Sequence, residues 1–313
     1  MNDAAPQLLA LDWGTSSLRA FAMREGRVVD ERSSAHGIQH LPQPGAAGFA
    51  QAFGQIAGEW LEPGVPVVAC GMVGSAQGWR EVPYVRCPAD VAALAASATS
   101  VPAGAGIDLL IAPGVMLDDP AQLPDVMRGE ETQVAGALRL HPALAARACV
   151  VLPGTHSKWV QVDAGRIETF ASHLTGEMFA VLRRHSILGR LMPPPEAAAT
   201  VHDEAFAIGL EAARKSRPGE LLHQVFAART LGLAGRLPHE ALPDFLSGLL
   251  IGHELVAGLA AAEGAPLVLV GDAALCARYA RALSAFGRDD VQVLPNTAPQ
   301  GLWDLAAAAG LLS

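Results

Sequence analysis

The stretch that decides the fold is LLALDWGTSSLRAFAM, from Leu8 to Met23. Four apolar residues lead into Asp12, a polar turn follows at Gly14-Thr15-Ser16-Ser17, and a second apolar segment begins at Leu18. Apolar runs on both sides of a glycine-containing turn predict a strand, a tight turn and a returning strand.

The turn carries the groups that a phosphate site needs. Gly14 lets an anion approach the backbone, where successive N–H groups can converge on phosphate oxygens. The three hydroxyls that follow add donors, and Arg19 carries a planar guanidinium suited to phosphate or carboxylate. Asp12 would repel a phosphate unless a cation lay between them, so we expect it to hold a hydrated magnesium ion through water. The alternative is an ordinary hairpin whose Asp and Ser residues make the turn.

Composition narrows the class of protein. The chain has 313 residues, which favours two domains, and 51% of them are hydrophobic while 5% are aromatic. No run approaches 18 apolar residues and the N-terminus lacks a basic segment, so we expect a soluble cytoplasmic protein without a membrane anchor. The net charge of −9 comes without any cluster of Lys or Arg, which disfavours nucleic acid as a partner. The four scattered cysteines are expected to be small buried hydrophobes.

A second turn repeats the logic of the first. In VVLPGTHSKWVQV, from Val150 to Val162, a strand breaks at Pro153-Gly154, crosses Thr155-His156-Ser157-Lys158 and resumes. Two such hairpins about 140 residues apart, in a chain of about two domains, predict a duplicated architecture with one phosphate turn in each half. His156 stays unassigned, because a histidine in a turn is more often a bystander than a base.

Three further segments stand out. A buried strand from Val67 to Cys70 opens into a glycine-rich loop, and such transitions at the edge of an α/β sheet bind ligands. Glu130 and Glu131 fall at a predicted helix N-terminus, where acidic residues also serve simply to favour the helix dipole. A third glycine turn, Gly271-Asp272, joins a strand to a helix, while the run from Pro113 to Asp125 is expected to be a surface loop.

Taken together, these segments resemble the actin-like, sugar-kinase ATPase superfamily. The runs LDWGTSSLRA, CGMVGSAQGW, VMRGEETQVAGA, LPGTHSKWVQV, LTGE and FLSGLLIGHE are similar, more closely, to the 2-dehydro-3-deoxygalactonokinase family. The resemblance implies two actin-like (ribonuclease H-like) α/β domains, with mixed sheets flanked by helices and a cleft between the domains. It places them at residues 1–136 and 137–313, with the helix 300–312 packing back near the first. It also implies transfer of phosphate from ATP to the 6-hydroxyl of 2-keto-3-deoxy-D-galactonate.

The resemblance also implies roles for individual residues. For the nucleotide and its magnesium, it implies Asp12, Gly14, Thr15, Ser16, Ser17, Arg19, Gly154, Thr155, Ser157, Gly271 and Asp272. For catalysis, it implies a base at Glu130 or Glu131, with Lys158 neutralising charge. For the sugar acid, we look to Met72, Val73, Gly74, Ser75, Trp79, Arg128, Thr175, Gly176 and Glu177. Arg128 beside Glu130 has the alternative role of a structural ion pair.

Two other functions remain as alternatives. One is a kinase of another sugar or sugar acid on the same fold, and the other is an actin-like sensor ATPase outside metabolism. ATP, magnesium and a small sugar acid are the expected ligands. Whether the chain is a monomer or a homodimer stays open.

Overall fold

The structure is a computed structural model that describes residues 5–104, 106–121, 123–194 and 201–312. It divides into two compact units. The first comprises Met1–Ala148, Val160–Phe170 and Asn296–Ser313, and the second comprises Cys149–Trp159 and Ala171–Pro295. Each unit has a hydrophobic core of its own.

The first unit is built on a six-stranded sheet with the order β3-β2-β1-β4-β7-β6. Its strands are β1 (Leu8–Trp13), β2 (Leu18–Arg24), β3 (Arg27–Ser34), β4 (Val67–Gly71), β6 (Thr99–Gly104) and β7 (Ile107–Ile111). The first three strands are antiparallel, whereas β4 is parallel to β1 and β7 is parallel to β4. The predicted opening hairpin is therefore confirmed.

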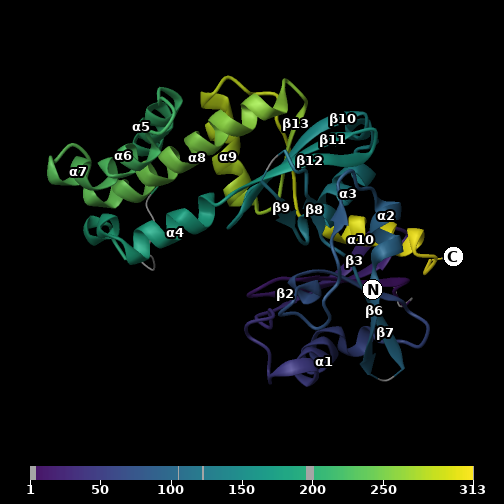
Figure 1. Cartoon of the computed structure of the whole chain (residues 1–313). Coiled ribbons are helices and arrows are strands. Elements are labelled where there is room, and N and C mark those ends of the chain that lie inside the picture. Colours follow the sequence, from purple (N-terminus) through teal and green to yellow (C-terminus); the bar gives the residue numbers. More distant parts are fainter. Residues whose placement is uncertain (1–4, 105, 122, 195–200, 313) are drawn as a thin grey trace. The chain divides into compact units, whose positions relative to one another are not determined.

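Helices cover both faces of this sheet, which explains why β1 is an almost continuous apolar run. Leu9, Leu11 and Trp13 of β1 belong to a core that includes Phe49 and Phe53 of α1 (Gly45–Ala57). Two further helices, α10 (Ala298–Ala308) and α3 (Glu130–Leu140), pack together, and α10 contacts β1 and β4 (Figure 1). The smaller helix α2 (Val91–Ser97) contacts α10.

Helices α3 and α10 approach each other closely through two glycines. A Cβ atom at Gly136 would lie 1.9 Å from the carbonyl oxygen of Thr297, and one at Gly301 would lie 1.8 Å from that of Thr132. No side chain fits at these distances. The contact fixes α3, and with it the two glutamates at its N-terminus.

The run from Pro113 to Asp125 is not wholly a loop, so that expectation was wrong. It contains β8 (Val115–Leu117), which is antiparallel to β9 (Asp125–Met127) and parallel to β5 (Val85–Arg86). These strands are two or three residues long, and strands this short leave no periodic signal in a sequence. The small sheet matters because β9 delivers the chain to α3.

The second sheet has the order β12-β11-β10-β13-β14. Its strands are β10 (Arg147–Leu152), β11 (Ser157–Asp163), β12 (Arg166–His173), β13 (Leu267–Val270) and β14 (Gln292–Leu294). The two sheets share an order of strands. The run β3-β2-β1-β4-β7 in the first sheet corresponds to β12-β11-β10-β13-β14 in the second, and the first sheet adds β6 beyond β7. The predicted duplication of the architecture is confirmed at the level of sheet topology.

The helices of the second unit are α4 (Thr175–His185), α5 (Asp203–Arg214), α6 (Leu221–Val225), α7 (Ala227–Leu233), α8 (Leu242–Ala262) and α9 (Ala273–Ala285). Helix α8 packs closely on α5, because a Cβ atom at Gly248 would lie 2.1 Å from the carbonyl oxygen of Phe206. The segment His239–Ala262 is long and apolar enough to cross a membrane by composition, but 61% of its most apolar window is buried inside the protein. That burial is what a core helix shows.

Candidate functional site

The first turn is held by backbone contacts and leaves its hydroxyls exposed. The N–H of Gly14 donates to the carbonyl of Ser17 at 2.9 Å, and Thr15, Ser16 and Ser17 are all exposed. Gly37 lies directly against the turn, since a Cβ atom there would be 2.4 Å from the backbone of Ser16 and Ser17. The turn is therefore rigid and offers its donors to solvent.

Asp12 lies at the edge of this turn with most of its side chain buried. Its Oδ2 atom accepts from Nη2 of Arg19 at 2.7 Å and from Nδ2 of Asn296 at 3.4 Å. Both contacts fall on the same carboxylate oxygen. Among the described residues, no group of three or more His, Cys, Asp or Glu side chains could hold a metal ion. A single carboxylate suits Mg²⁺, which usually keeps several waters and takes its remaining ligands from phosphates.

The start of α3 depends on one glycine. Gly129 has φ of +110°, a conformation that L side chains rarely adopt, and a Cβ atom there would meet Cα of Gly71 at 3.3 Å. Directly after this turn, Glu130 and Glu131 point in different directions. Oε2 of Glu130 accepts from the backbone N–H of Arg128 at 3.0 Å, whereas Oε2 of Glu131 accepts from that of Gly129 at 2.7 Å.

The two glutamates also differ in exposure and charge. Glu130 is half-buried, but Glu131 is fully buried and its Oε1 atom has no hydrogen-bond partner among the described residues. Burial, together with the neighbouring charge of Glu130, raises the pKa of Glu131 to about 8. At neutral pH Glu131 is therefore mainly protonated.

The glycine-rich loop after β4 is more deeply packed than its sequence indicates. Val73 and Ser75 are buried, and the Ser75 hydroxyl donates to the carbonyl of Met72 at 2.8 Å. Trp79 stacks on Phe49 with ring centroids 5.6 Å apart. Only Met72 and Trp79 among the five predicted sugar-acid residues of this loop are half-exposed, while Gly74 is buried against Arg128.

The guanidinium of Arg128 is held by Val82 and Tyr84. Nη2 donates to the carbonyl of Val82 at 2.7 Å, and Cζ lies 4.3 Å from the ring centroid of Tyr84. The buried Nε and Nη1 atoms have no hydrogen-bond partner among the described residues. The backbone N–H of Arg128, in contrast, donates to Glu130.

The second turn is tied down by side chains instead. Ser157 is fully buried, and its hydroxyl lies 2.9 Å from that of Tyr279. Lys158 is also buried and donates to the hydroxyl of Ser172. Of the predicted phosphate-binding residues here, Thr155 is exposed and Gly154 half-buried.

The segment Thr175–Glu177 packs onto this turn. A Cβ atom at Gly176 would lie 2.4 Å from the carbonyl oxygen of Gly154, and the N–H of Glu177 donates to the carbonyl of Thr155 at 2.9 Å. The carboxylate of Glu177 pairs with Nε2 of His156. Three residues predicted to bind the sugar acid are thus neighbours of the second phosphate turn.

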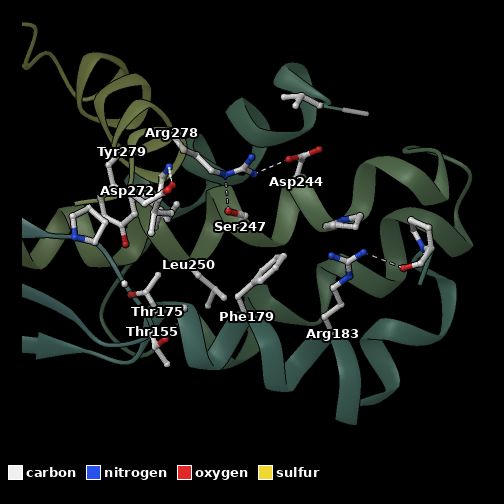
Figure 2. A pocket seen from close by; sticks show the side chains of 18 of the residues that line it. Thr155, Thr175, Phe179, Arg183, Asp244, Ser247, Leu250, Asp272, Arg278 and Tyr279 are labelled. Atoms are coloured by element: carbon white, nitrogen blue, oxygen red, sulfur yellow. Dashed lines mark hydrogen bonds and ion pairs between the residues drawn. The ribbon is translucent and has the colours of Figure 1, made fainter. Parts of the chain in front are cut away.

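A pocket of about 730 Å³ opens beside the second turn, wholly within the second unit (Figure 2). Gly154, Thr155, Thr175 and Gly176 lie on its wall with Asp272, whose carboxylate caps α9 by accepting from the N–H of Leu275 at 2.9 Å. Preceding Asp272, Gly271 has φ of +143°. Phe179 and Leu250 give the pocket an apolar side, and Arg278 pairs with Asp244 at 2.7 Å at another part of the wall (Figure 2).

Comparison with known proteins identifies the family. The family model of 2-keto-3-deoxy-galactonokinase matches residues 12–305. The chain belongs to this family. A 2-dehydro-3-deoxygalactonokinase from Escherichia coli is 38% identical over 303 residues, covering 96% of this chain and 97% of the relative. A Sinorhizobium meliloti crystal structure, provisionally assigned the same activity, is 33% identical with a TM-score of 0.82 and covers 96% of this chain and 98% of that one.

A distant structure supports the fold alone. Component A of the (R)-2-hydroxyglutaryl-CoA dehydratase from Acidaminococcus fermentans is 14% identical, with a TM-score of 0.50 over 97% of this chain and 98% of that chain. The predicted α/β fold, with mixed sheets flanked by helices, is confirmed.

The sequence of this galactonokinase-family chain predicts both turns, but it does not predict the residues that hold the turns in place. Asn296, Gly37, Tyr279 and Glu254 were not predicted, although each contacts a predicted residue or lies against its turn. One signal was present. Glu254 is a lone acidic residue in the apolar run FLSGLLIGHELVAG, and such a residue in a buried helix requires partners.

Proposed function

We propose that this chain transfers the γ-phosphate of ATP to the 6-hydroxyl of 2-dehydro-3-deoxy-D-galactonate, giving the 6-phosphate and ADP in galactonate breakdown. The observation that carries the proposal is the family match over residues 12–305, which includes both turns, the start of α3 and the second-unit pocket. The 38% identical relative bears the name of this activity. A cytoplasmic location fits the reaction.

The nucleotide is assigned to the two turns and the pocket beside the second. The pocket combines backbone and hydroxyl donors at Gly154 and Thr155 with an apolar side formed by Phe179 and Leu250. Phosphate and a nucleoside need this combination of polar and apolar surface. That Gly14 and Gly154 serve the phosphates of the same ATP molecule stays a prediction of the family resemblance, as does the role of Lys158.

Magnesium fits the residues at the first turn. One oxygen of Asp12 is committed to Arg19 and Asn296, so the other oxygen is available to accept from metal-bound water. When bound with ATP, the ion would neutralise charge on the phosphates. Asp12 and the exposed hydroxyls of the turn would orient that complex.

We assign the catalytic base to Glu130. A general base must be ionised and must reach the hydroxyl whose proton it accepts. Glu130 is half-exposed, whereas Glu131 is fully buried, mainly protonated at neutral pH and fixed to the N–H of Gly129. Glu131 then acts as a neutral support that keeps a second negative charge away from Glu130.

The carboxylate of the sugar acid is assigned to Arg128. Its Nε and Nη1 donors are buried without a partner among the described residues, and leaving such donors unpaired costs roughly 1–3 kcal/mol. A ligand carboxylate that reached them would remove that cost. Gly74 and Met72, which lie next to this side chain or in the same loop, would border the substrate.

The test compares Glu130→Gln with Glu131→Gln. We expect Glu130→Gln to lower kcat by a factor of about 10² to 10⁴ with little change in the affinity for ATP. Glu131→Gln replaces a neutral acid by a neutral amide and should keep most of the activity. Equal loss in both variants, or loss in Glu131→Gln alone, would show that the base is assigned to the wrong residue.

A substrate panel tests the acceptor. Phosphorylation of 2-keto-3-deoxy-galactonate should exceed that of 2-keto-3-deoxy-gluconate, glycerol and pentuloses. A faster reaction with any of these would favour a kinase of another sugar or sugar acid. ATP turnover that no sugar acid stimulates would favour a sensor ATPase.

A further inference from the structure

Behind the second turn lies a buried carboxylate that no predicted role uses. Glu254 of α8 is 3% exposed, and its side chain accepts three hydrogen bonds. Oε1 receives Nε1–H of Trp159 at 2.8 Å, and Oε2 receives the hydroxyls of Tyr279 at 2.8 Å and of Thr175. The three donors satisfy the carboxylate, as burial requires.

Tyr279 connects Glu254 to the second turn through a chain of hydrogen bonds in which every donor points toward Glu254. A carboxylate can only accept, so Tyr279 donates to Glu254 and its oxygen accepts from Ser157. Ser157 in turn accepts from the N–H of Gly154, through a long contact of 3.5 Å. Burial and the charge of Glu254 raise the pKa of Tyr279 well above its usual value, so the phenol keeps the proton that it donates.

The second hydrogen bond to Oε2 of Glu254 comes from Thr175, the first residue of α4. Thr175 commits its hydroxyl proton to Glu254, and it lines the pocket beside Gly154 and Thr155. Figure 2 shows the side chains of Thr155 and Thr175 near each other at one side of the pocket, with Tyr279 above them. One carboxylate thus links two segments of the pocket wall that are about 20 residues apart in the chain.

We propose that Glu254 and Tyr279 are positioning residues for the nucleotide: they hold the second turn and the start of α4 in the geometry that binds ATP. This inference rests on the proposed kinase function and assigns to it Glu254, which lies outside the pocket lining, and Tyr279, which lines the pocket but commits its hydroxyl to Glu254 and Ser157. Since small displacements of binding groups are costly, breaking the link should weaken ATP binding selectively.

The chain offers a matched control. Trp159 donates to the same carboxylate, but through Oε1, and its hydrogen bond leads to neither pocket segment. Tyr279→Phe and Glu254→Gln change the link while preserving shape, whereas Trp159→Phe removes the third donor. A purely structural role for Glu254 predicts that all three variants behave alike.

The experiment measures the Kd of Mg-ATP by calorimetry, KM for both substrates and the Tm of each variant. We expect Tyr279→Phe and Glu254→Gln to raise the Kd and KM of ATP by about 10- to 100-fold, with KM for the sugar acid unchanged. Trp159→Phe should lower Tm without changing the Kd of ATP. Should Glu254→Gln not fold, Thr175→Val tests the same link from the half-buried start of α4.

Two results would overturn the inference. One is a Kd of ATP within about twofold of wild type in Tyr279→Phe and in the Glu254 or Thr175 variant. The other is an equal weakening in Trp159→Phe. A wild-type protein that binds ATP but phosphorylates no sugar acid would overturn the proposed function instead, and the binding constants would still decide the role of Glu254.

Discussion

The two turns share a sequence pattern but are stabilised in different ways. In the first, Thr15, Ser16 and Ser17 are exposed and the backbone of a neighbouring loop holds the turn. In the second, Ser157 is fully buried and bonded to Tyr279. The same residue type in the same kind of motif is therefore available to a ligand in one unit and committed to the core in the other.

Each unit also contains a buried glutamate, and the two differ in their hydrogen bonds. Glu131 accepts a hydrogen bond from the N–H of Gly129 through Oε2, and its Oε1 atom has no partner among the described residues. Glu254 accepts three. The first unit thus holds an acid that keeps its proton, whereas the second holds a carboxylate that organises donors. Burial alone does not distinguish these roles; the number of donors does.

The largest effect should come from breaking each turn through its neighbouring glycine. A Cβ atom at Gly37 or Gly176 would lie 2.4 Å from the backbone of the first or second turn, whereas one at Gly54 of α1 would meet nothing within 4 Å. We expect Gly37→Ala and Gly176→Ala to reduce kcat/KM by about 100-fold. Gly54→Ala is the control and should leave kcat/KM near the wild-type value.

Separate measurement of kcat and of KM for ATP sharpens the comparison between the turns. If the second turn serves nucleotide binding, Gly176→Ala should act mainly on KM for ATP. If the first turn orients the transferred phosphate, Gly37→Ala should act mainly on kcat. Steady-state kinetics separate the two parameters. The same parameter changing in both variants would contradict this division of labour.

The sequence is sufficient to predict the strands and turns, but it is insufficient to predict the distant residues that hold them in place. Strand, turn and strand at Leu8–Met23 follow from apolar runs around a glycine turn, which are local properties. The pairing of Asp12 with Asn296 joins residues 284 positions apart, and no local pattern reports it. Likewise, the sequence of Thr175–Glu177 does not reveal that it packs on Gly154, because that contact depends on how β12 delivers the chain to α4.

The candidate site shows the same limit. The sequence placed Glu130 and Glu131 together at a helix start, but adjacent helical residues point about 100° apart. Tertiary packing, including that of Gly129 against Gly71, determines which of them is buried. The choice between the two carboxylates is therefore a property of tertiary structure.

A smaller effect is expected from a change at Asp12, a carboxylate beside the first turn that has no counterpart at the second. Asp12→Asn keeps the shape of the side chain but loses the charge that we propose holds hydrated magnesium. The magnesium concentration for half-maximal activity should rise by about 10- to 100-fold, as when other outer ligands are lost. Asn296→Ala removes a 3.4 Å contact to Asp12 and the hydrogen bond that Asn296 accepts from the N–H of Ala298 at 3.1 Å. It keeps the charge of Asp12, so it should shift that magnesium concentration far less. An unchanged magnesium requirement in Asp12→Asn would exclude Asp12 as the group that holds the ion.

The smallest effect concerns the pH dependence of stability. Because the folded chain raises the pKa of Glu131 from its usual 4.5 to about 8, folding binds a proton there. The corresponding stability is fully present below about pH 4.5 and is lost as pH rises through 8, at up to about 1.4 kcal/mol per pH unit. Urea unfolding from pH 5 to pH 8 should therefore show wild type losing stability relative to Glu131→Gln. Glu130→Gln removes a charge that raises this pKa, so it should weaken the trend without abolishing it. Parallel pH profiles for wild type and Glu131→Gln would mean that Glu131 is already ionised in the folded chain, and the contrast with Glu254 would disappear.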